Sequence, residues 1–160
     1  MRFLWFGKKK SNSPQVIEEA EAPIPVEVFS VSNFLIESNP QPSVKGTELS
    51  HQTIHALALS ILSQSSTPAD LAAQEFFQEH GSSRLPVSDY SYSAERGYSG
   101  RVSDGEITRN VLIGSPKVIA RATTPWSAAI EKAARENPEV FVLAIDGIAY
   151  AAYSVTSELQ

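Results

Sequence analysis

The sequence predicts an α+β domain: an antiparallel sheet of two or more hairpins, with helices packed against one side of it. Asp-Gly dipeptides at 104–105 and 146–147 divide the strand-forming runs 98–113 and 140–155. Asp-Gly favours the positive φ angles of a type I′ hairpin turn. Helical patterns precede the first pair of strands and separate it from the second. Antiparallel strands grouped between helices are typical of this class.

Length and charge limit the functions that this chain can have. Its 160 residues suit one domain with a core, and they exclude a complete transporter. Thirteen Lys and Arg against eighteen Asp and Glu give a net charge of -5, so nucleic acid is not an expected partner. With no cysteine, the sequence offers no disulfide, thiolate nucleophile or cysteine zinc site. The predicted location is the cytoplasm.

Residues 1–45 are predicted to be an N-terminal extension or linker, and residues 46–160 the domain. Four apolar residues precede three lysines in the segment 3–10, which is too short for a signal-peptide core or a membrane span. This segment either contacts a membrane protein or the membrane surface, as a peripheral anchor at the inner face, or is a locally packed N-terminus. The β-branched and aromatic run 26–31 predicts a strand, and the prolines within 39–46 predict a loop.

Three of the four helices are predicted from apolar spacing or from proline positions. The first covers 48–64, and the Ser-Pro and Thr-Pro dipeptides at 115–116 and 124–125 begin helices over 115–121 and 125–136. The apolar residues that define the face of the first helix are Ile54, Leu57, Ile61 and Leu62.

The remaining helix, over 68–80, has the clearest start and end signals. Thr67 suits the N-cap, and Pro68 suits the first helical position. Asp70 interacts favourably with the positive end of the helix dipole. Gly81 is a common residue just beyond a helix C-terminus.

Most isolated polar side chains carry no specific chemical signal. His51 and His55 are four residues apart on a predicted helix, a spacing that suits a shared metal ion, but no H-E-x-x-H pattern or third ligand accompanies them. Solvated surface histidines are the alternative, and no metal is predicted. Ser93, Ser99 and Ser103 are interpreted as strand or turn serines. No G-x-S-x-G elbow or Walker loop supports a serine hydrolase or P-loop NTPase.

The run 92–100 and the segment 113–117 have the residue types of a nucleotide site. Tyr92 offers a ring for base stacking, Arg96 a charge for phosphate or ribose, and Gly114 a close backbone approach before a helix. The alternative is an aromatic residue in a hydrophobic cluster, a solvated arginine and an ordinary helix start.

Four segments in order resemble landmarks of the nucleotide-binding (N) domain of P-type cation-transporting ATPases. Residues 92–96, Tyr-Ser-Ala-Glu-Arg, are similar to its F-S-S-E-R-like stretch. Residues 112–117 are similar to its K-G-A-P-E or V-G-S-like pocket segment. Residues 65–68, Ser-Ser-Thr-Pro, resemble its S-x-H-P or E-T-P motif, and residues 141–147 resemble its closing hairpin.

This resemblance implies the fold of an N domain and a pocket for ATP or ADP. It implies that Tyr92 stacks on adenine and that Arg96 contacts phosphate or ribose. It also implies that Thr67, Ser93 and Gly114 line the pocket.

The same resemblance implies that the chain is not an ATPase. Residues 26–38 align with the strand that leads into D-K-T-G-T-L-T, and Ser32 occupies the position of the phosphorylated aspartate. A serine forms no acyl phosphate, and the sequence has no G-D-G-x-N-D segment. Gly97 and Ile113 stand where the family often has lysines. Each lost phosphate contact costs about 1–3 kcal/mol, so weakened nucleotide binding is expected.

The sequence is compatible with three functions. The first is a non-catalytic domain that binds ATP or ADP. The second is a protein-interaction or regulatory module with the same fold and a non-binding pocket, which a pocket filled by side chains or lined by Asp89 and Glu95 would favour. The third is one part of a split P-type ATPase whose membrane and phosphorylation parts lie on another chain.

Overall fold

The computed structural model describes residues 26–79, 83–120 and 126–159. The chain forms two compact units, of which Phe29–Glu158 is one and the terminal segments 1–28 and 159–160 are the other. Residues 29–45 fall within the larger unit. The segment 3–10 lies outside the described residues. Within the described ranges, no helix combines the length and apolar character that crossing a membrane requires.

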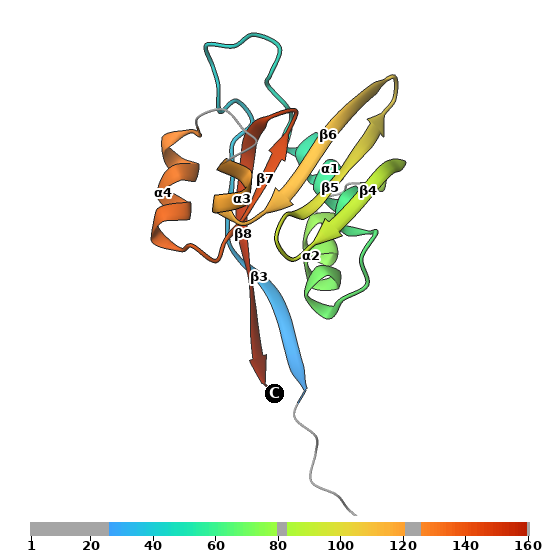
Figure 1. Ribbon diagram of the computed structural model, residues 1–160, viewed down its shortest axis with the longest axis vertical. Helices are drawn as coiled ribbons and strands as arrows, with labels where there is room; N and C mark the ends of the chain where they lie inside the picture. Colours follow the sequence, from blue (N-terminus) through green and yellow to red (C-terminus); the bar gives the residue numbers. More distant parts are fainter. Residues whose placement is uncertain (1–25, 80–82, 121–125, 160) are drawn as a thin grey trace, which may run out of the picture. The chain divides into compact units, whose positions relative to one another are not determined.

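Six strands and four helices are described (Figure 1). The helices are α1 (His51–Leu62), α2 (Pro68–Gln78), α3 (Pro116–Ala120) and α4 (Ala128–Glu136). The strands are β3 (Glu27–Ile36), β4 (Val87–Ser93), β5 (Gly97–Asp104), β6 (Ile107–Gly114), β7 (Phe141–Ile145) and β8 (Ile148–Leu159).

The strands form one sheet in the order β3-β8-β7-β6-β5-β4, and the successive pairs from β4 to β8 are antiparallel. Both predicted hairpins are present. Asp146 and Gly147, at φ 52° and 81°, are the central residues of the β7–β8 turn, as a type I′ turn requires. In the β5–β6 turn the central residues are Gly105 and Glu106, and Gly105 has a positive φ. The prediction of Asp104 as a central residue there is wrong.

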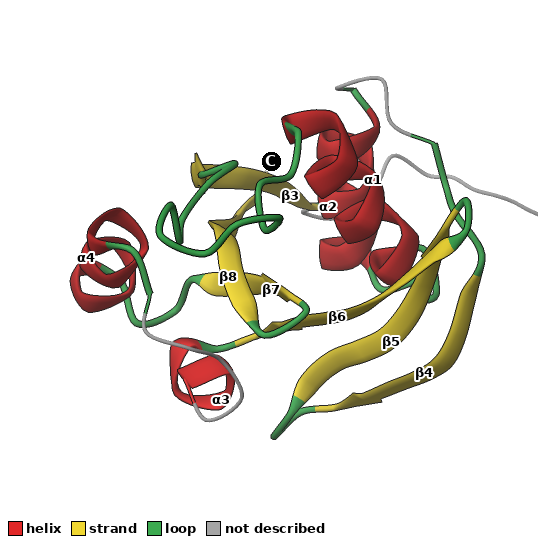
Figure 2. Cartoon of the chain, turned by 90° about the horizontal axis from the view of Figure 1, so that it is seen from above, coloured by secondary structure: helices red, strands yellow, loops and turns green. Residues whose placement is uncertain are grey.

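The four helices cover both faces of the sheet, so the prediction that they pack on one side is wrong (Figure 2). Leu143 and Ile145 of β7 pack with α1 and α2, whereas Val142 and Ala144 pack with α3 and α4. Successive side chains of a strand point to opposite faces, so every residue of the apolar run 141–145 needs a partner layer. The second pair of helices provides the second layer.

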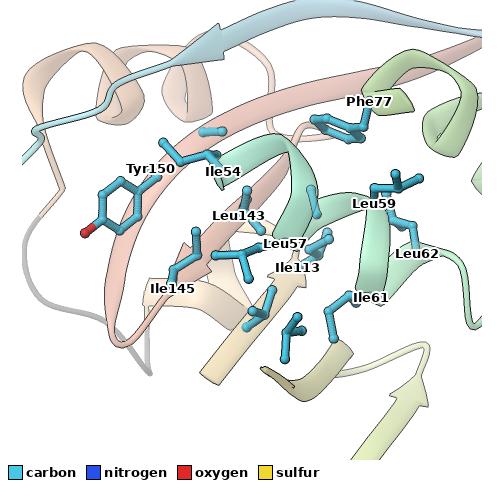
Figure 3. Close-up of a cluster of buried hydrophobic side chains, with 14 of the residues drawn as sticks. Ile54, Leu57, Leu59, Ile61, Leu62, Phe77, Ile113, Leu143, Ile145 and Tyr150 are labelled. Carbon is cyan, nitrogen blue, oxygen red and sulfur yellow. The ribbon is translucent and has the colours of Figure 1, made fainter. Parts of the chain in front are cut away.

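The larger core lies between α1, α2 and the sheet (Figure 3). The four apolar residues predicted for the face of α1 are all fully buried there. Phe77 of α2 meets Tyr153 of β8 edge-on, with ring centroids 5.5 Å apart. The hydroxyl of Ser60 in α1 accepts a hydrogen bond from the backbone N–H of Leu85 at 2.8 Å, which fixes the chain just before β4.

The helix boundaries agree with the sequence in part. Ser50 caps α1 and Thr67 caps α2, each accepting a hydrogen bond from the backbone N–H three residues later. Helix α4 begins at Ala128 with Ser127 as its N-cap, not at Pro125 as predicted. The Thr-Pro dipeptide and the predicted helix stop at Gly81 lie outside the described residues.

The two histidines of α1 have different surroundings. His51 is exposed, whereas His55 is 3% exposed and packs between Phe34 and Phe77, with ring centroids 5.5 Å from each. Its Nδ1 lies 2.7 Å from the carbonyl oxygen of His51. The interpretation of both as solvated histidines is therefore wrong for His55, which is part of the core. The described residues contain no group of three or more His, Cys, Asp or Glu side chains arranged for a metal ion.

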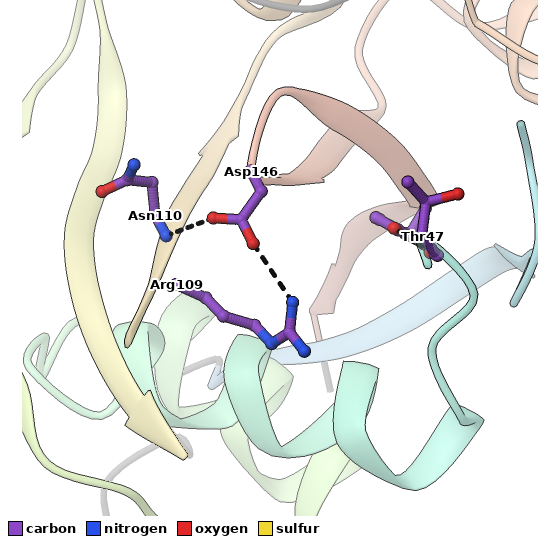
Figure 4. A network of polar contacts seen from close by, with 5 residues as sticks. Thr47, Arg109, Asn110 and Asp146 are labelled. Carbon is purple, nitrogen blue, oxygen red and sulfur yellow. Dashed lines mark hydrogen bonds and ion pairs between the residues drawn. The ribbon is translucent and has the colours of Figure 1, made fainter. Parts of the chain in front are cut away.

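A polar network links the β7–β8 turn to the neighbouring strand β6 (Figure 4). The carboxylate of Asp146 accepts hydrogen bonds from the backbone N–H of Asn110 at 2.9 Å and from the guanidinium of Arg109 at 3.1 Å. The backbone N–H of Asp146 in turn donates to the carbonyl of Asn110 at 2.8 Å. These contacts fix the register of β6 against β7 and account for an aspartate in a left-handed conformation.

Candidate functional site

The N-terminus of α2 brings polar side chains to one edge of the α1–α2 layer. The Thr67 hydroxyl accepts a hydrogen bond from the backbone N–H of Asp70 at 3.2 Å. The Gln74 amide donates to the carbonyl oxygens of Leu62 at 2.7 Å and Ser65 at 2.9 Å. The loop between the two helices is therefore held at both ends, and its hydroxyl groups lie beside the helix start.

The Asp70 carboxylate is the centre of a buried hydrogen-bond cluster. The Tyr98 hydroxyl of β5 donates to its two oxygens at 2.6 and 2.7 Å, and the Ser65 hydroxyl donates to Oδ2 at 2.6 Å. Asp70 is 8% exposed and Tyr98 is 7% exposed. Buried charges persist when hydrogen bonds satisfy them, so this cluster joins α2 to the sheet at a defined position.

Two tyrosine rings from neighbouring strands form the floor and the rim of the site. Tyr92 of β4 lies opposite Tyr98 of β5, and their ring centroids are 4.7 Å apart at an interplanar angle of 46°. Tyr98 is buried, but Tyr92 is 54% exposed. An exposed aromatic ring supported from below by a second ring is suited to stacking against a flat ligand.

A pocket of about 550 Å³ opens between the α2 N-terminus, β4, β5, β7 and β8. Its volume is within the usual range for small-molecule sites. It is lined by Gln64, Ser65, Ser66, Thr67, Ala69, Asp70, Tyr90, Tyr92, Tyr98, Phe141 and Val155.

A smaller pocket of about 130 Å³ adjoins it and shares Tyr92, Tyr98 and Phe141 with it. The smaller pocket is otherwise lined by Ser93, Ala94, Glu95, Gly97, Gly114, Ser115 and Val118. The three shared aromatic residues therefore stand where the two spaces meet.

The tight turn between β4 and β5 shapes the smaller pocket. The Ser93 hydroxyl accepts a hydrogen bond from the backbone N–H of Arg96 at 3.0 Å. Gly97 follows at φ 77°, and a Cβ atom there would lie 2.2 Å from the carbonyl oxygen of Ile113. The backbone of the turn is thus in close contact with the end of β6, where Gly114 lines the pocket.

Four of the five predicted site residues line one or both of these pockets. Thr67 lines the larger pocket, Ser93 and Gly114 line the smaller one, and Tyr92 lines both. Arg96 is exposed on the β4–β5 turn and lines neither.

Several lining residues have no ligand-facing role that the sequence predicts. Asp70 is interpreted from sequence as a helix-dipole residue, and nothing in the sequence pairs it with Tyr98. Phe141 is identified only as part of the closing hairpin. Their positions depend on the packing of α2 and β7 beside β5, which no local pattern specifies.

Burial is the main reason that the pKa of the Tyr98 phenol is raised above its usual value, and its hydrogen bond to Asp70 adds to the effect. The pKa of Tyr90 is also raised, by burial first and then by the negative charge of Asp70. The negative charge of Asp70 therefore acts on Tyr90, which also lines the larger pocket.

The substitution Tyr98→Phe is expected to make stability less sensitive to alkaline pH. Because the pKa of Tyr98 is raised on folding, the unfolded chain loses this proton first, near pH 10, and stability falls as pH rises from there towards the folded pKa. One such tyrosine contributes up to about 1.4 kcal/mol per pH unit to that fall. Urea unfolding between about pH 9 and 11 measures the slope. An unchanged slope in the variant would show that Tyr98 ionises equally easily in both states.

No protein-family model and no curated protein sequence matches the chain. Solved structures do match. The N-domain of HMA6, a copper-transporting P-type ATPase, is 15% identical at a TM-score of 0.58, over 80% of this chain and 98% of that one. The N-domain of HMA8, also a copper-transporting P-type ATPase, is 12% identical at a TM-score of 0.56, over 79% of this chain and 99% of that one.

The catalytic domain of the CPx-ATPase CopB-B is 18% identical at a TM-score of 0.53, over 83% of this chain and 39% of that one. The chain thus corresponds to nearly all of an isolated N-domain and to well under half of a larger catalytic domain. The described part of this protein has the fold of a P-type ATPase N-domain.

Proposed function

We propose that this chain binds adenine nucleotides, ATP or ADP, without hydrolysing them. The observation that carries the proposal is the exposed ring of Tyr92 at the junction of the two pockets. In the proposed complex the base stacks on this ring, with Phe141 beside it. Thr67, Ser93 and Gly114 line the space around the ligand.

Arg96 remains part of the proposal as the candidate contact to ribose or phosphate. It can reach only a part of the ligand that protrudes from the pockets, because it lines neither of them. The non-catalytic part of the proposal is supported by the resemblance in sequence, where Ser32 stands at the position of the phosphorylated aspartate. The proposed location is the cytoplasm.

The substitution Tyr92→Ala is expected to weaken ATP binding by about tenfold to a hundredfold, because stacking of a base on an aromatic ring contributes about 1–3 kcal/mol. Isothermal titration calorimetry measures the dissociation constant. Tyr92→Phe keeps the ring and should retain affinity close to that of the original chain. Equal affinities of all three proteins would contradict a stacking role for Tyr92.

A second function, a protein-interaction or regulatory module with a non-binding pocket, is favoured by one observation. Asp70 and Glu95, both acidic, line the two pockets. Asp89 lines neither and pairs instead with Arg101 at 3.4 Å. Lack of binding by adenosine, ADP and ATP alike at millimolar concentration would favour this second function over the first.

A further inference from the structure

The charges that line the two pockets have one sign. Asp70 and Glu95 are the acidic lining residues, and no Lys, Arg or His is among the described residues that line either space. Arg96 and Lys117 are next to lining residues in the chain, but both are exposed and neither lines a pocket. An anion bound in either pocket would therefore be repelled by carboxylates, and no positively charged lining residue would offset this repulsion.

In the contacts that the structure records, the carboxylate of Asp70 accepts hydrogen bonds from neutral groups alone. Its partners are the Tyr98 and Ser65 hydroxyls, and its own backbone N–H bonds to Thr67. The ion pairs found among the described residues do not include it. Neutral donors stabilise a carboxylate but leave its field in place, and Asp70 is accordingly one cause of the raised pKa of Tyr90.

The remaining lining of the larger pocket suits an uncharged, flat, polar molecule. Tyr90, Tyr92, Tyr98 and Phe141 supply aromatic surface, and Ser66 and Thr67 supply hydroxyl groups. Sites of this kind bind through apolar burial, with a few polar groups that set the orientation. A nucleoside provides a ring for the aromatic residues and sugar hydroxyls for the serine and threonine.

We propose that the site prefers an uncharged nucleoside to the corresponding nucleotide, and that Glu95 is a residue that opposes the phosphate groups. This inference rests on the proposed function, because it requires that a base occupies the pocket. Glu95 lies in the β4–β5 turn, on the wall of the smaller pocket beside Ser93 and Gly97. A phosphate chain that extends from a base stacked on Tyr92 into this pocket approaches the Glu95 carboxylate.

The test compares adenosine with ATP by calorimetry, without divalent cations, on the whole chain. We expect adenosine to bind at least as tightly as ATP. Added salt should strengthen ATP binding, because screening weakens repulsion between like charges, whereas phosphates held by cations bind more weakly in salt.

Glu95→Lys should raise the affinity for ATP relative to adenosine by about tenfold, because it replaces a repulsive charge with an attractive one. Glu106→Lys is the matched control, since Glu106 is exposed in the β5–β6 turn and lines neither pocket. It makes the same change in net charge and should leave the ratio unchanged.

Three results would contradict different parts of these proposals. ATP binding that is tighter than adenosine binding and weakens with salt would overturn the nucleoside preference while supporting the proposed function. Equal effects of the two lysine substitutions would overturn the role of Glu95. Failure of both ligands to bind at millimolar concentration would overturn the proposed function itself, and this inference with it.

Discussion

Phe77→Ala is expected to lower the free energy of unfolding by about 3–5 kcal/mol, the usual cost of truncating a buried phenylalanine. Phe77 is fully buried, and its ring meets Tyr153, Phe76 and Phe34 in edge-on contacts at centroid distances of 5.5, 5.3 and 6.0 Å. Two of these contacts join α2 to the sheet, because Tyr153 belongs to β8 and Phe34 to β3. The surrounding rings belong to different elements, so they cannot easily close the cavity.

Urea unfolding followed by circular dichroism measures this loss. Leu71→Ala is the control on the same helix, because Leu71 is 50% exposed and its truncation should change stability by less than about 1 kcal/mol. Similar losses for the two variants would mean that α2 does not present Phe77 to the core.

Gly97→Ala is expected to cost about 3 kcal/mol of stability and to disturb the smaller pocket. A Cβ atom at Gly97 would lie 2.2 Å from the Ile113 carbonyl oxygen and 2.9 Å from the Gly114 Cα, and both are backbone atoms. The positive φ of 77° adds a conformational cost for any L side chain. The β4–β5 turn must therefore move away from β6.

Gly105→Ala separates the two parts of this cost. Gly105 also has a positive φ, of 69°, but a Cβ atom there meets nothing within 4 Å. It should therefore show only the conformational cost, about 1–2 kcal/mol. Equal losses at the two glycines, measured by thermal unfolding, would contradict the close approach of the turn to β6.

The parts of the fold that are visible in the sequence are those with local causes. Helix α2 was predictable because Thr67 and Pro68 act within a single turn of helix. The β7–β8 hairpin was predictable because Asp146 and Gly147 both take positive φ angles. The α1 face was predictable because its apolar residues repeat with the helical period.

Strand β4 was not predicted, and its residues explain why. It is an edge strand next to β5 alone, and its serines and Asp89 are exposed, so no alternating apolar pattern marks it. A register shift between Ser88 and Ser91, with Asp89 at φ 54°, interrupts its pairing with β5. Its strand conformation comes from pairing with a neighbour, which the local sequence does not encode.

The candidate site also has parts that the sequence indicates and parts that depend on tertiary packing. Tyr92 was identifiable as a candidate site residue because residues 92–96 resemble a motif of the N domain, and it lines both pockets. The Asp70–Tyr98 pair was not identifiable, because 28 positions separate two residues that the packing of α2 on the sheet brings together. The placement of helices on both faces followed from burial of the whole β7 run, which a strand pattern alone does not distinguish from burial on one face.

The most direct test of nucleotide binding is a residue-by-residue NMR titration of the whole chain with ATP, ADP and adenosine. We expect saturable shifts at Tyr92, Ser93, Thr67 and Gly114, while the β5–β6 turn at Gly105 remains unaffected. Shifts confined to residues remote from the two pockets, or no shift at millimolar ligand, would contradict this expectation.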